Sequence, residues 1–595
     1  MSELTKNTYW KSLNELAQNK EYQKFVEREF PEDATELKDG VSRKGFLRVM
    51  GASIALAGFA ACRRPVQKIL PYSKQPEDIV PGIPLYYATS MPFQGNLTGL
   101  VIENHQGRPN KIEGNEDHPN SKGCTNAYVH ASMLEMYDPD RSRKPLRNGE
   151  KSSTDDFFSF SEDYFSDTNK RIAFISEANS SPSYNKLKKQ ALAKFNNSSW
   201  VTYEPFGETN SIEGNFLAFG KRLRTHYNYL NADIVVSIDD NFLSNTHHNN
   251  IEYAGAVTSM RKVLHINDTM NRIYAIENGF TLTGSYADHR LRIKASEIAD
   301  FTNALAAILS KKMDGLNSFS SISNSFTNTE FLTALAEDLI VNRGRSAVSI
   351  GNDHAPEIHA VVAAINNALG NIGNTVNYLD VPHFNNQNAS EVFNALIPKI
   401  AAGNFDAVVI IGANPVYNAP SDLNFKEALS SAKEVFHLGK YCNETGQSAS
   451  WHLSRTHYLE AWGDGYSFTG TRYVIQPQIQ PLHDSISEIE FLTAIVSGKK
   501  SSGYELVRET FKSFHSNNTE NKWLDALHNG FDDVDTYSIV NTSIKNIEPA
   551  PSTSLEGIEV VFKPDDTIYD GRFANLGWLQ EMPDPMTKIT WDNVA

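Results

Sequence analysis

Short, uninterrupted apolar runs that alternate with helix-like segments are the feature that most restricts the fold of this chain. From about residue 170, apolar runs rich in β-branched residues are bounded by turn residues, and we expect strands at 171–176, 232–238, 347–350, 407–411 and 434–438. Apolar side chains spaced three or four positions apart predict helices at 301–313, 329–342, 357–369 and 486–496. Strands that are apolar along their whole length belong in parallel sheets covered on both faces. The pattern therefore predicts doubly wound α/β domains.

A smaller β-rich region precedes the α/β part. Residues 99–103 and 111–114 look like strands joined by the turn Asn104-His-Gln-Gly107. At 595 residues the chain is also too long for a single core. The expected divisions are an N-terminal extension with an export signal (1–62), a Pro-rich linker (63–85), the small β-rich domain (86–150), a first α/β domain (151–345), a second one (346–500), and a return segment that begins a further, truncated domain (501–595). Stretches rich in Ser and Asn at 151–169, 317–328 and 513–522 are expected to be surface loops or insertions.

Residues 42–62 form a predicted export signal. A basic pair and a Phe-Leu pair precede a short apolar run, and the residues that carry the signal are Arg43, Lys44, Phe46 and Leu47. The pattern is similar to a twin-arginine signal with Lys44 in place of the second arginine. The apolar run of about 13 residues is shorter than the roughly 20 that a bilayer-spanning helix needs. The sequence around Cys62 resembles a lipobox, which makes Cys62 a candidate lipid-attachment site. The alternative to an export signal is a buried amphipathic helix with one free cysteine.

Charge and cysteine content exclude several classes of function. The chain has 55 basic and 71 acidic residues, a formal net charge of −16, which argues against nucleic acid and against direct adsorption to an anionic membrane. A basic electron-transfer partner would suit this charge. The three cysteines, Cys62, Cys124 and Cys442, include no CxxC pair. This chain alone therefore cannot build a closed thiolate zinc site or an iron–sulfur cluster.

Two segments of the sequence resemble the molybdopterin oxidoreductases. One is residues 107–123 followed by Tyr137-Asp-Pro-Asp-Arg141, and the other is residues 405–415 with Ala419-Pro420. Weaker matches are Thr283-Gly284 with Ala287-Asp288, and Gly370-Asn-Ile-Gly373. The segments follow the family's order along the chain. The resemblance implies a multidomain α/β molybdopterin-oxidoreductase (DMSO-reductase-like) fold with doubly wound parallel sheets and a small β-rich N-terminal domain.

The N-terminal region is similar to the molybdopterin-oxidoreductase-like component of bacterial alternative complex III, a membrane quinol oxidoreductase. The residues that carry this similarity are the export signal, Tyr9-Trp10-Lys-Ser-Leu and Arg28-Glu-Phe-Pro-Glu32. The resemblance implies three kinds of partner: an iron–sulfur ferredoxin-like domain, a multihaem cytochrome c subunit and quinol-binding membrane subunits. It also implies a peripheral position on the periplasmic face of the cytoplasmic (inner) membrane, held by these partners or by a lipid anchor.

Residues that active members of the family need are missing. The family places Cys-x2-Cys-x3-Cys before its first strand pair, where this chain has the cysteine-free stretch 86–95. Cys124 stands near the family's fourth cysteine and is expected to be a small buried residue. The family's metal ligand comes from a loop whose counterpart here is 201–211. Glu204, Glu208 and Ser211 carry oxygen atoms there, but we expect exposed loop side chains and assign no catalytic, cofactor-binding or metal-binding residue.

We therefore expect a non-catalytic region that contains no molybdopterin and supports iron–sulfur clusters on a further domain or partner. Two alternatives stay open: an active molybdenum–pterin oxidoreductase acting on a small oxyanion or sulfur substrate, and a periplasmic small-molecule-binding module. Gly412-Ala-Asn-Pro415 follows a predicted strand and is the segment that would hold a pterin nucleotide. His247-His248 lies among asparagines and is predicted to lie in a solvated loop.

Overall fold

The computed structural model describes residues 79–590, apart from 323–325, 327, 383, 385–387, 533–536, 542 and 553–554. The chain divides into two units between Asp78 and Ile79, and the described residues belong to the second. The predicted export-signal residues Arg43, Lys44, Phe46 and Leu47, and Cys62, lie outside the described residues. Within the described residues, no helix is both long enough and apolar enough to cross a membrane.

A three-stranded antiparallel sheet opens the described part of the chain. It consists of β1 (Leu85–Phe93), β2 (Asn96–His105) and β3 (Arg108–Gly114), in that order. The strands predicted at 99–103 and 111–114 lie inside β2 and β3, and the predicted turn connects them. Gly107 adopts a φ of +77° in this turn, where a glycine is favoured. The helix α4 (Ala127–Met136) packs on the sheet through an apolar cluster that includes Leu100, Ile112 and Met133.

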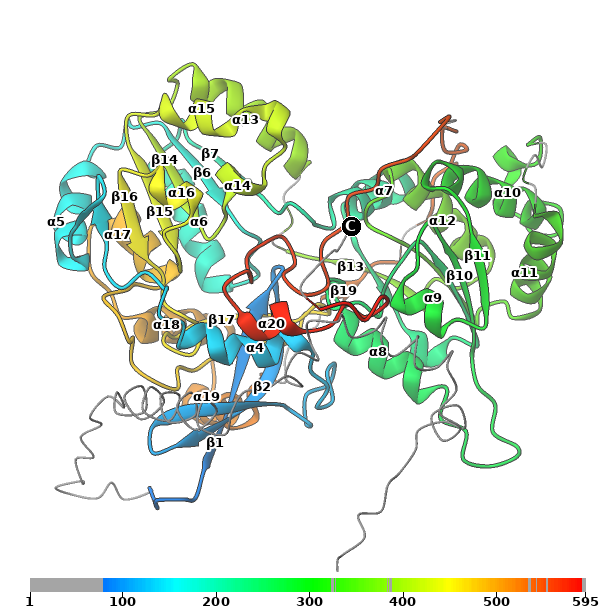
Figure 1. Cartoon of the computed structure of the whole chain (residues 1–595), viewed down its shortest axis with the longest axis horizontal. Coiled ribbons are helices and arrows are strands. Elements are labelled where there is room, and N and C mark those ends of the chain that lie inside the picture. Colours follow the sequence, from blue (N-terminus) through cyan, green and yellow to red (C-terminus); the bar gives the residue numbers. More distant parts are fainter. Residues whose placement is uncertain are drawn as a thin grey trace, which may run out of the picture. The chain divides into compact units, whose positions relative to one another are not determined.

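A seven-stranded sheet with the order β5-β4-β16-β15-β14-β6-β7 forms one of the α/β layers (Figure 1). Its parallel strands are β6 (Ile172–Ser176), β7 (Ser199–Thr202), β14 (Ala407–Ile411), β15 (Val435–Gly439) and β16 (Trp451–Ser454), and the short hairpin of β4 (Leu146–Arg147) and β5 (Glu150–Lys151) extends the β16 edge. Alternate side chains of the strands enter two separate cores. One core includes α5 (Thr154–Tyr164), α6 (Pro182–Lys194) and α17 (Glu488–Ser497); the other includes α13 (Ala389–Ala401) and α15 (Phe425–Ser430). Helices therefore cover both faces, as predicted.

A second parallel sheet has the order β11-β10-β9-β12. Its strands are β9 (Ile234–Ile238), β10 (Arg272–Glu277), β11 (His289–Arg292) and β12 (Ser346–Ile350). The helices in this half are α7 (Thr209–Phe219), α8 (Asn250–Ser259), α9 (Leu282–Tyr286), α10 (Ile298–Ser310), α11 (Thr329–Val341) and α12 (Pro356–Ala368). An antiparallel sheet of β8 (Arg224–Tyr227), β13 (Val376–Asp380) and β19 (Ser538–Ile539) lies in the same half. The predicted strands and helices of this part agree with the structure to within a few residues.

Strands from both sides of residue 345, the expected boundary between the two α/β domains, pair within each parallel sheet. The strand β14 hydrogen-bonds to β6, and β12 hydrogen-bonds to β9. A parallel strand needs a buried position with helices on both faces, and a long crossover can bring it there from far along the chain. The composition of the sequence does not show which of these strands will pair.

Two stretches expected to be surface loops or insertions contain helix. The structure places α5 within 151–169, because Ser153 and Asp156 form a capping box and Phe157 packs into the core. The helices α18 (Gly503–Phe514) and α19 (Thr519–Asn529) enter 513–522 from both ends. Abundant Ser and Asn misled the prediction, since both residues also cap helices.

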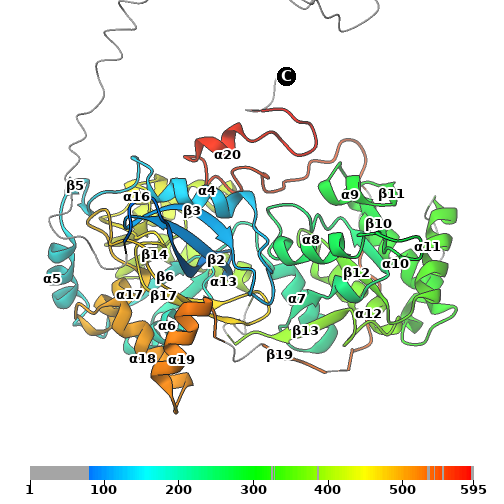
Figure 2. The ribbon, with the colours of Figure 1, turned by 90° about the horizontal axis from the view of Figure 1, so that it is seen from below.

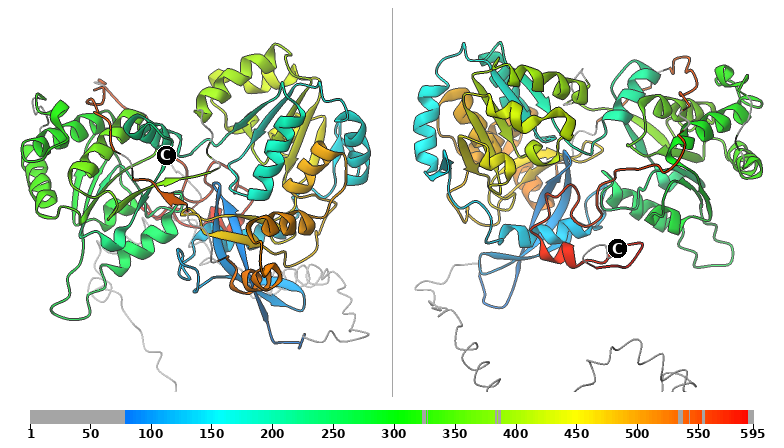
Figure 3. Two further views of the ribbon diagram at one scale, coloured as in Figure 1. Left: turned by 180° about the vertical axis from the view of Figure 1, so that it is seen from behind. Right: turned by 45° about the horizontal axis from the view of Figure 1, so that its top comes forward.

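The remaining elements complete the described part. They are the hairpin of β17 (Gly463–Tyr466) and β18 (Arg472–Ile475), the helices α14 (Pro415–Asn418), α16 (Glu444–Gln447) and α20 (Gly577–Glu581), and 3-10 turns at Tyr229–Asn231, Ala295–Glu297, Asn317–Phe319 and Ser421–Leu423. The C-terminal segment runs from the elements around the four-stranded sheet to α20, which lies beside α4 (Figures 2 and 3). Tyr569, Phe573 and Leu579 of this segment share a core with Tyr128 of α4.

Candidate functional site

The parallel strands of the seven-stranded sheet all end at one edge, and the residues that follow them line a cavity of about 690 Å³, here called the sheet-edge cavity. Glu177 follows β6, Tyr203 and Glu204 follow β7, Gly412 follows β14, Lys440 follows β15 and Arg455 follows β16. The chain proceeds from β6 to β7 in one direction and from β14 to β16 in the other. The cavity therefore lies at the switch point of the sheet, where open α/β sheets bind their ligands.

Arg455 lies between two carboxylates of this cavity. Its Nη2 is 2.5 Å from Oε1 of Glu177, and it also contacts Oε1 of Glu488, the first residue of α17. Burial raises the pKa of Glu488 by more than Arg455 lowers it. Burial acts the same way on Glu177, but Arg455 and Arg572 outweigh it and lower the pKa of that carboxyl. The Arg455 guanidinium is thus paired with two carboxyl groups whose pKa values are shifted in opposite directions.

Arg572 reaches the cavity from the C-terminal segment. Its Nη2 is 2.9 Å from Oε2 of Glu204, and its Nε is 2.8 Å from Oδ1 of Asp570. The backbone N–H of Ala178 donates to the other oxygen of Glu204 at 2.8 Å. Burial raises the pKa of Glu204 despite Arg572, whereas Arg572 outweighs burial at Asp570 and lowers its pKa. Like Arg455, the Arg572 guanidinium is therefore paired with two carboxylates.

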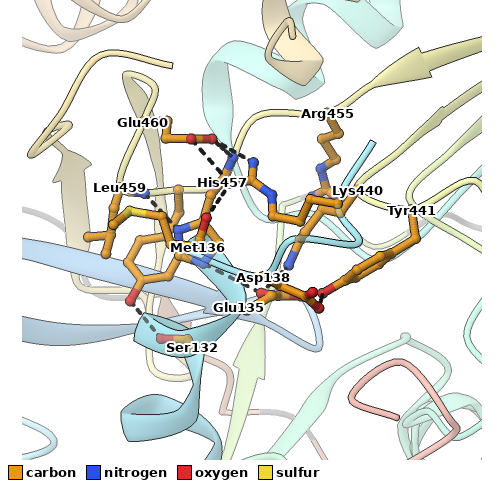
Figure 4. Close-up of polar contacts among 12 residues, drawn as sticks. Ser132, Glu135, Met136, Asp138, Lys440, Tyr441, Arg455, His457, Leu459 and Glu460 are labelled. Carbon is orange, nitrogen blue, oxygen red and sulfur yellow. Dashed lines mark hydrogen bonds and ion pairs between the residues drawn. The ribbon is translucent and has the colours of Figure 1, made fainter. Parts of the chain in front are cut away.

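A third cluster lies where α4 meets the loops after β15 and β16 (Figure 4). Lys440 Nζ is 2.6 Å from Oε2 of Glu135, and His457 Nε2 is 3.4 Å from the same oxygen. Burial alone would raise the pKa of Glu135, but Lys440 and His457 bring it well below its usual range. Burial lowers the pKa of His457 to about 4, so this imidazole is neutral at pH 7. Tyr441 donates a 2.8 Å hydrogen bond to Asp138.

The segments that resemble the molybdopterin oxidoreductases make structural contacts around the cavity. Arg141 forms two hydrogen bonds with Glu460, at 3.1 and 2.6 Å, and both side chains are almost completely buried. His118, in the first resembling segment, is buried against Tyr473 of β18 and contacts its hydroxyl. These contacts join the small sheet and α4 to the segment that follows β16.

Glu204 and Glu208, in the loop at 201–211, are not exposed as expected. Glu204 faces the sheet-edge cavity with 10% of its side chain accessible, held by Arg572. Glu208 lies outside the cavity lining and forms a 2.8 Å ion pair with the buried Arg224. Ser211 is half-buried in the first turn of α7. The arginine partner of Glu204 is 368 residues away along the chain, and that of Glu208 is 16 residues away across α7, so neither pairing is visible within the loop itself.

The structure contradicts the predicted burial of Cys124 and the predicted solvation of His247 and His248. Cys124, expected to be buried, is exposed, and Cys442 is half-buried in the lining of the cavity. The stretch at 86–95 forms most of β1 and its turn. His247 and His248 are half-buried rather than solvated; His247 is 3.4 Å from Asp240, and burial lowers the pKa of His248 to about 4.

Sequence reasoning missed the charged residues that dominate the cavity. Three of them come directly after a strand. Glu177 follows β6 and Lys440 follows β15, which were both predicted, and Arg455 follows β16, which pairs with β15. A charged residue at the carboxyl end of several parallel strands was the available signal, because those ends meet at one edge. Arg572 gave no comparable signal, since it lies far along the chain and follows none of the strands predicted from the sequence.

Gly412 offers a direct test of how tightly the ion pairs are packed. It turns with a φ of +78°, and a Cβ there would stand 2.5 Å from Cδ of Glu177 and 2.7 Å from Nη1 of Arg455. We expect Gly412→Ala to lower the free energy of unfolding by about 2 kcal/mol, from backbone strain and displacement of the pair. Gly403→Ala is the matched control, because Gly403 has a φ of +68° with no described atom within 4 Å, and about 1 kcal/mol is expected. Equal losses in denaturant titrations would argue against a crowded pair.

Comparison with known proteins gives one kind of match. No protein-family model matches the sequence, and no curated protein sequence matches it. Among solved structures, the chain is similar to acetylene hydratase from Pelobacter acetylenicus, with a TM-score of 0.51, 12% sequence identity, and 69% of each chain covered. At this identity the likeness concerns the fold alone. The chain therefore has the multidomain α/β fold of the molybdopterin oxidoreductases, as the resembling segments predicted.

Proposed function

We propose that this chain is a non-catalytic, molybdopterin-oxidoreductase-like scaffold region of a membrane-bound quinol oxidoreductase of the alternative complex III type. In this proposal it supports an iron–sulfur electron-transfer domain, and electrons pass from quinol towards a cytochrome c or an oxidase through groups on other domains and subunits. The observation that carries the proposal is the lining of the sheet-edge cavity. Carboxylates fill the ligand-binding edge of the fold and neutralise every arginine and lysine in that lining.

The residues of the cavity do not fit a pterin nucleotide. Such a cofactor carries phosphate groups, which sites at the carboxyl ends of strands receive on free backbone N–H groups and cations. Here Glu177 occupies the space over the Gly412 turn, and Arg455 is already paired with Glu177 and Glu488. Burial also raises the pKa of the Cys442 thiol, which opposes the thiolate form that a soft metal ligand requires.

The proposed partners are the ferredoxin-like iron–sulfur domain, the multihaem cytochrome c subunit and the quinol-binding membrane subunits. The proposed position is the periplasmic face of the cytoplasmic membrane, reached through the export signal and held peripherally. Support comes from the residues around the signal and from the net charge of −16, which favours basic partners over a bare anionic membrane. Deleting this chain while keeping the iron–sulfur domain should abolish assembly, and a deletion strain with normal quinol turnover would contradict the scaffold role.

Metal content tests the proposal most directly. We expect molybdenum and tungsten well below one atom per chain when the protein is purified from membranes in its native assembly and measured by mass spectrometry. Iron measured in the same sample serves as the internal control, since the partners' clusters and haems should keep it high. A value near one molybdenum or tungsten atom per chain would instead favour the alternative of an active molybdenum–pterin enzyme.

The third alternative, a small-molecule-binding module, is favoured by one specific observation. The sheet-edge cavity keeps about 690 Å³ of space even with its ion pairs formed. Ligand sites in proteins commonly have roughly 300–1,000 Å³. A scaffold role and a bound small molecule are compatible, because docking uses the outer surface and the ligand would occupy the interior.

A further inference from the structure

The sheet-edge cavity is lined by segments from distant parts of the chain. The strand ends of the seven-stranded sheet line one side of it. The turn between β1 and β2 lines it as well, as do residues 570–575 of the C-terminal segment. The start of α17, Glu135 of α4 and residues within 456–464 also contribute to the lining. A space of this size at the switch point of a sheet is suited to a small organic molecule rather than to a single ion.

The lining of the cavity has a strong excess of negative charge. Its carboxylates are Glu135, Asp140, Glu177, Glu204, Glu444, Asp464, Glu488 and Asp570, and its cations are Lys440, Arg455 and Arg572. Eight carboxylates and three cations give a formal charge of −5. Arg455 and Arg572 are each shared by two carboxylates, so no cation among these lining residues is left to attract an anion.

Burial and, at two positions, neighbouring carboxylates disfavour the charged form of three of these acids. Burial raises the pKa of Glu204, Glu488 and Asp464, and neighbouring carboxylates add to the effect at Glu204 and Glu488. Hydroxyl donors from Ser181 and Ser183 stabilise Asp464 without supplying a positive charge. A cation entering the cavity would relieve this repulsion, whereas an anion would increase it.

A further feature of the lining points to an organic cation. Tyr417, Tyr441 and Trp462 also line the cavity, and aromatic faces attract organic cations at about 0.5–2 kcal/mol per contact. Among the residues that the structure describes, no group of three or more His, Cys, Asp and Glu side chains is arranged to hold a metal ion.

We infer that the sheet-edge cavity binds a small organic cation, an amine or guanidine with one or more positive charges. The inference rests on the proposed function in one respect, namely that no pterin occupies the cavity. The expected ligand fills several hundred cubic ångströms and pairs with carboxylates on more than one wall of the cavity.

Binding of two probe amines to the full chain tests this inference. Agmatine and spermidine, added at millimolar concentration, are expected to raise the melting temperature by at least about 2 °C. Calorimetric titration should show affinity that falls with added salt, as screening predicts. Pyrophosphate and guanosine diphosphate should give no shift. No shift with either amine, or a larger shift with the two anions, would overturn the inference.

A matched pair of variants locates the site. Glu204→Gln removes one charge from the lining but keeps the oxygen that accepts from Ala178, and should weaken agmatine binding about tenfold. Asp155→Asn makes the same charge change on an exposed residue outside the lining and should leave the affinity within about twofold. Glu444→Gln, at the exposed rim, guards against misfolding and should weaken binding about threefold. Equal effects of Glu204→Gln and Asp155→Asn would contradict the location.

Metal content measured on the same preparation separates the two proposals. Low molybdenum and tungsten without amine binding would overturn the inference and leave the scaffold proposal intact. Near-stoichiometric metal would overturn the scaffold proposal and, with it, the free cavity that an amine requires.

Discussion

Replacing Arg141 by methionine is expected to lower the free energy of unfolding by about 3–5 kcal/mol. The guanidinium makes two hydrogen bonds to Glu460 and one to the carbonyl of Met136, and both members of the ion pair are almost completely inaccessible. Methionine fills a similar volume but leaves the Glu460 carboxylate buried without its cation. Urea unfolding followed by circular dichroism measures the loss.

Two further variants control this prediction. Arg143→Met, two residues away on an exposed side chain, should change stability by less than about 0.5 kcal/mol. Adding Glu460→Gln to Arg141→Met should recover part of the loss, because a neutral amide costs less to bury than an unpaired charge. A double variant less stable than Arg141→Met alone would show that the backbone N–H donors to Glu460 matter more than its charge.

Acid is expected to unfold the protein between about pH 6.5 and pH 4. Burial lowers the pKa of five buried histidines: to about 4 for His118, His452 and His457, to about 3 for His359, and well below the usual range for His437. Histidine in an unfolded chain titrates near about pH 6.5. The unfolded chain therefore binds more protons below that pH, and stability falls by up to about 1.4 kcal/mol per pH unit for each histidine. The raised pKa values of Glu204, Glu488 and Asp464 act in the opposite direction and offset part of the loss.

His359 isolates one of these contributions. It lies on α12 with 6% of its surface exposed, and its Nε2 has no hydrogen-bond partner among the described residues. His359→Leu should reduce the slope of unfolding free energy against pH by up to about 1.4 kcal/mol per unit between about pH 4 and pH 6. The same comparison at about pH 8, where the imidazole is neutral in both states, reports only the change in packing. An unchanged slope would mean that His359 takes up its proton in the folded protein.

A structural element could be predicted from the sequence when the residues that cause it are neighbours along the chain. The strands β6, β9, β12, β14 and β15 were predicted because their residues are apolar on both faces, and that property is visible in a few consecutive letters. The helix α5 was missed because Ser153 and Asp156 suit a loop and a capping box equally well. Glu204 was expected to be exposed because a carboxylate gives no local sign of a distant arginine such as Arg572.

The amino-acid sequence by itself determined the fold class, since hydrophobic periodicity sets the secondary structure and fully apolar strands require a covered parallel sheet. It also determined that this chain lacks the cysteines for an iron–sulfur cluster of its own. Only the tertiary structure decided which strands pair across residue 345, and which acids and bases meet in the sheet-edge cavity. Strand pairing and ion pairing join residues hundreds of positions apart, such as Glu204 and Arg572, and no local pattern encodes such a distance.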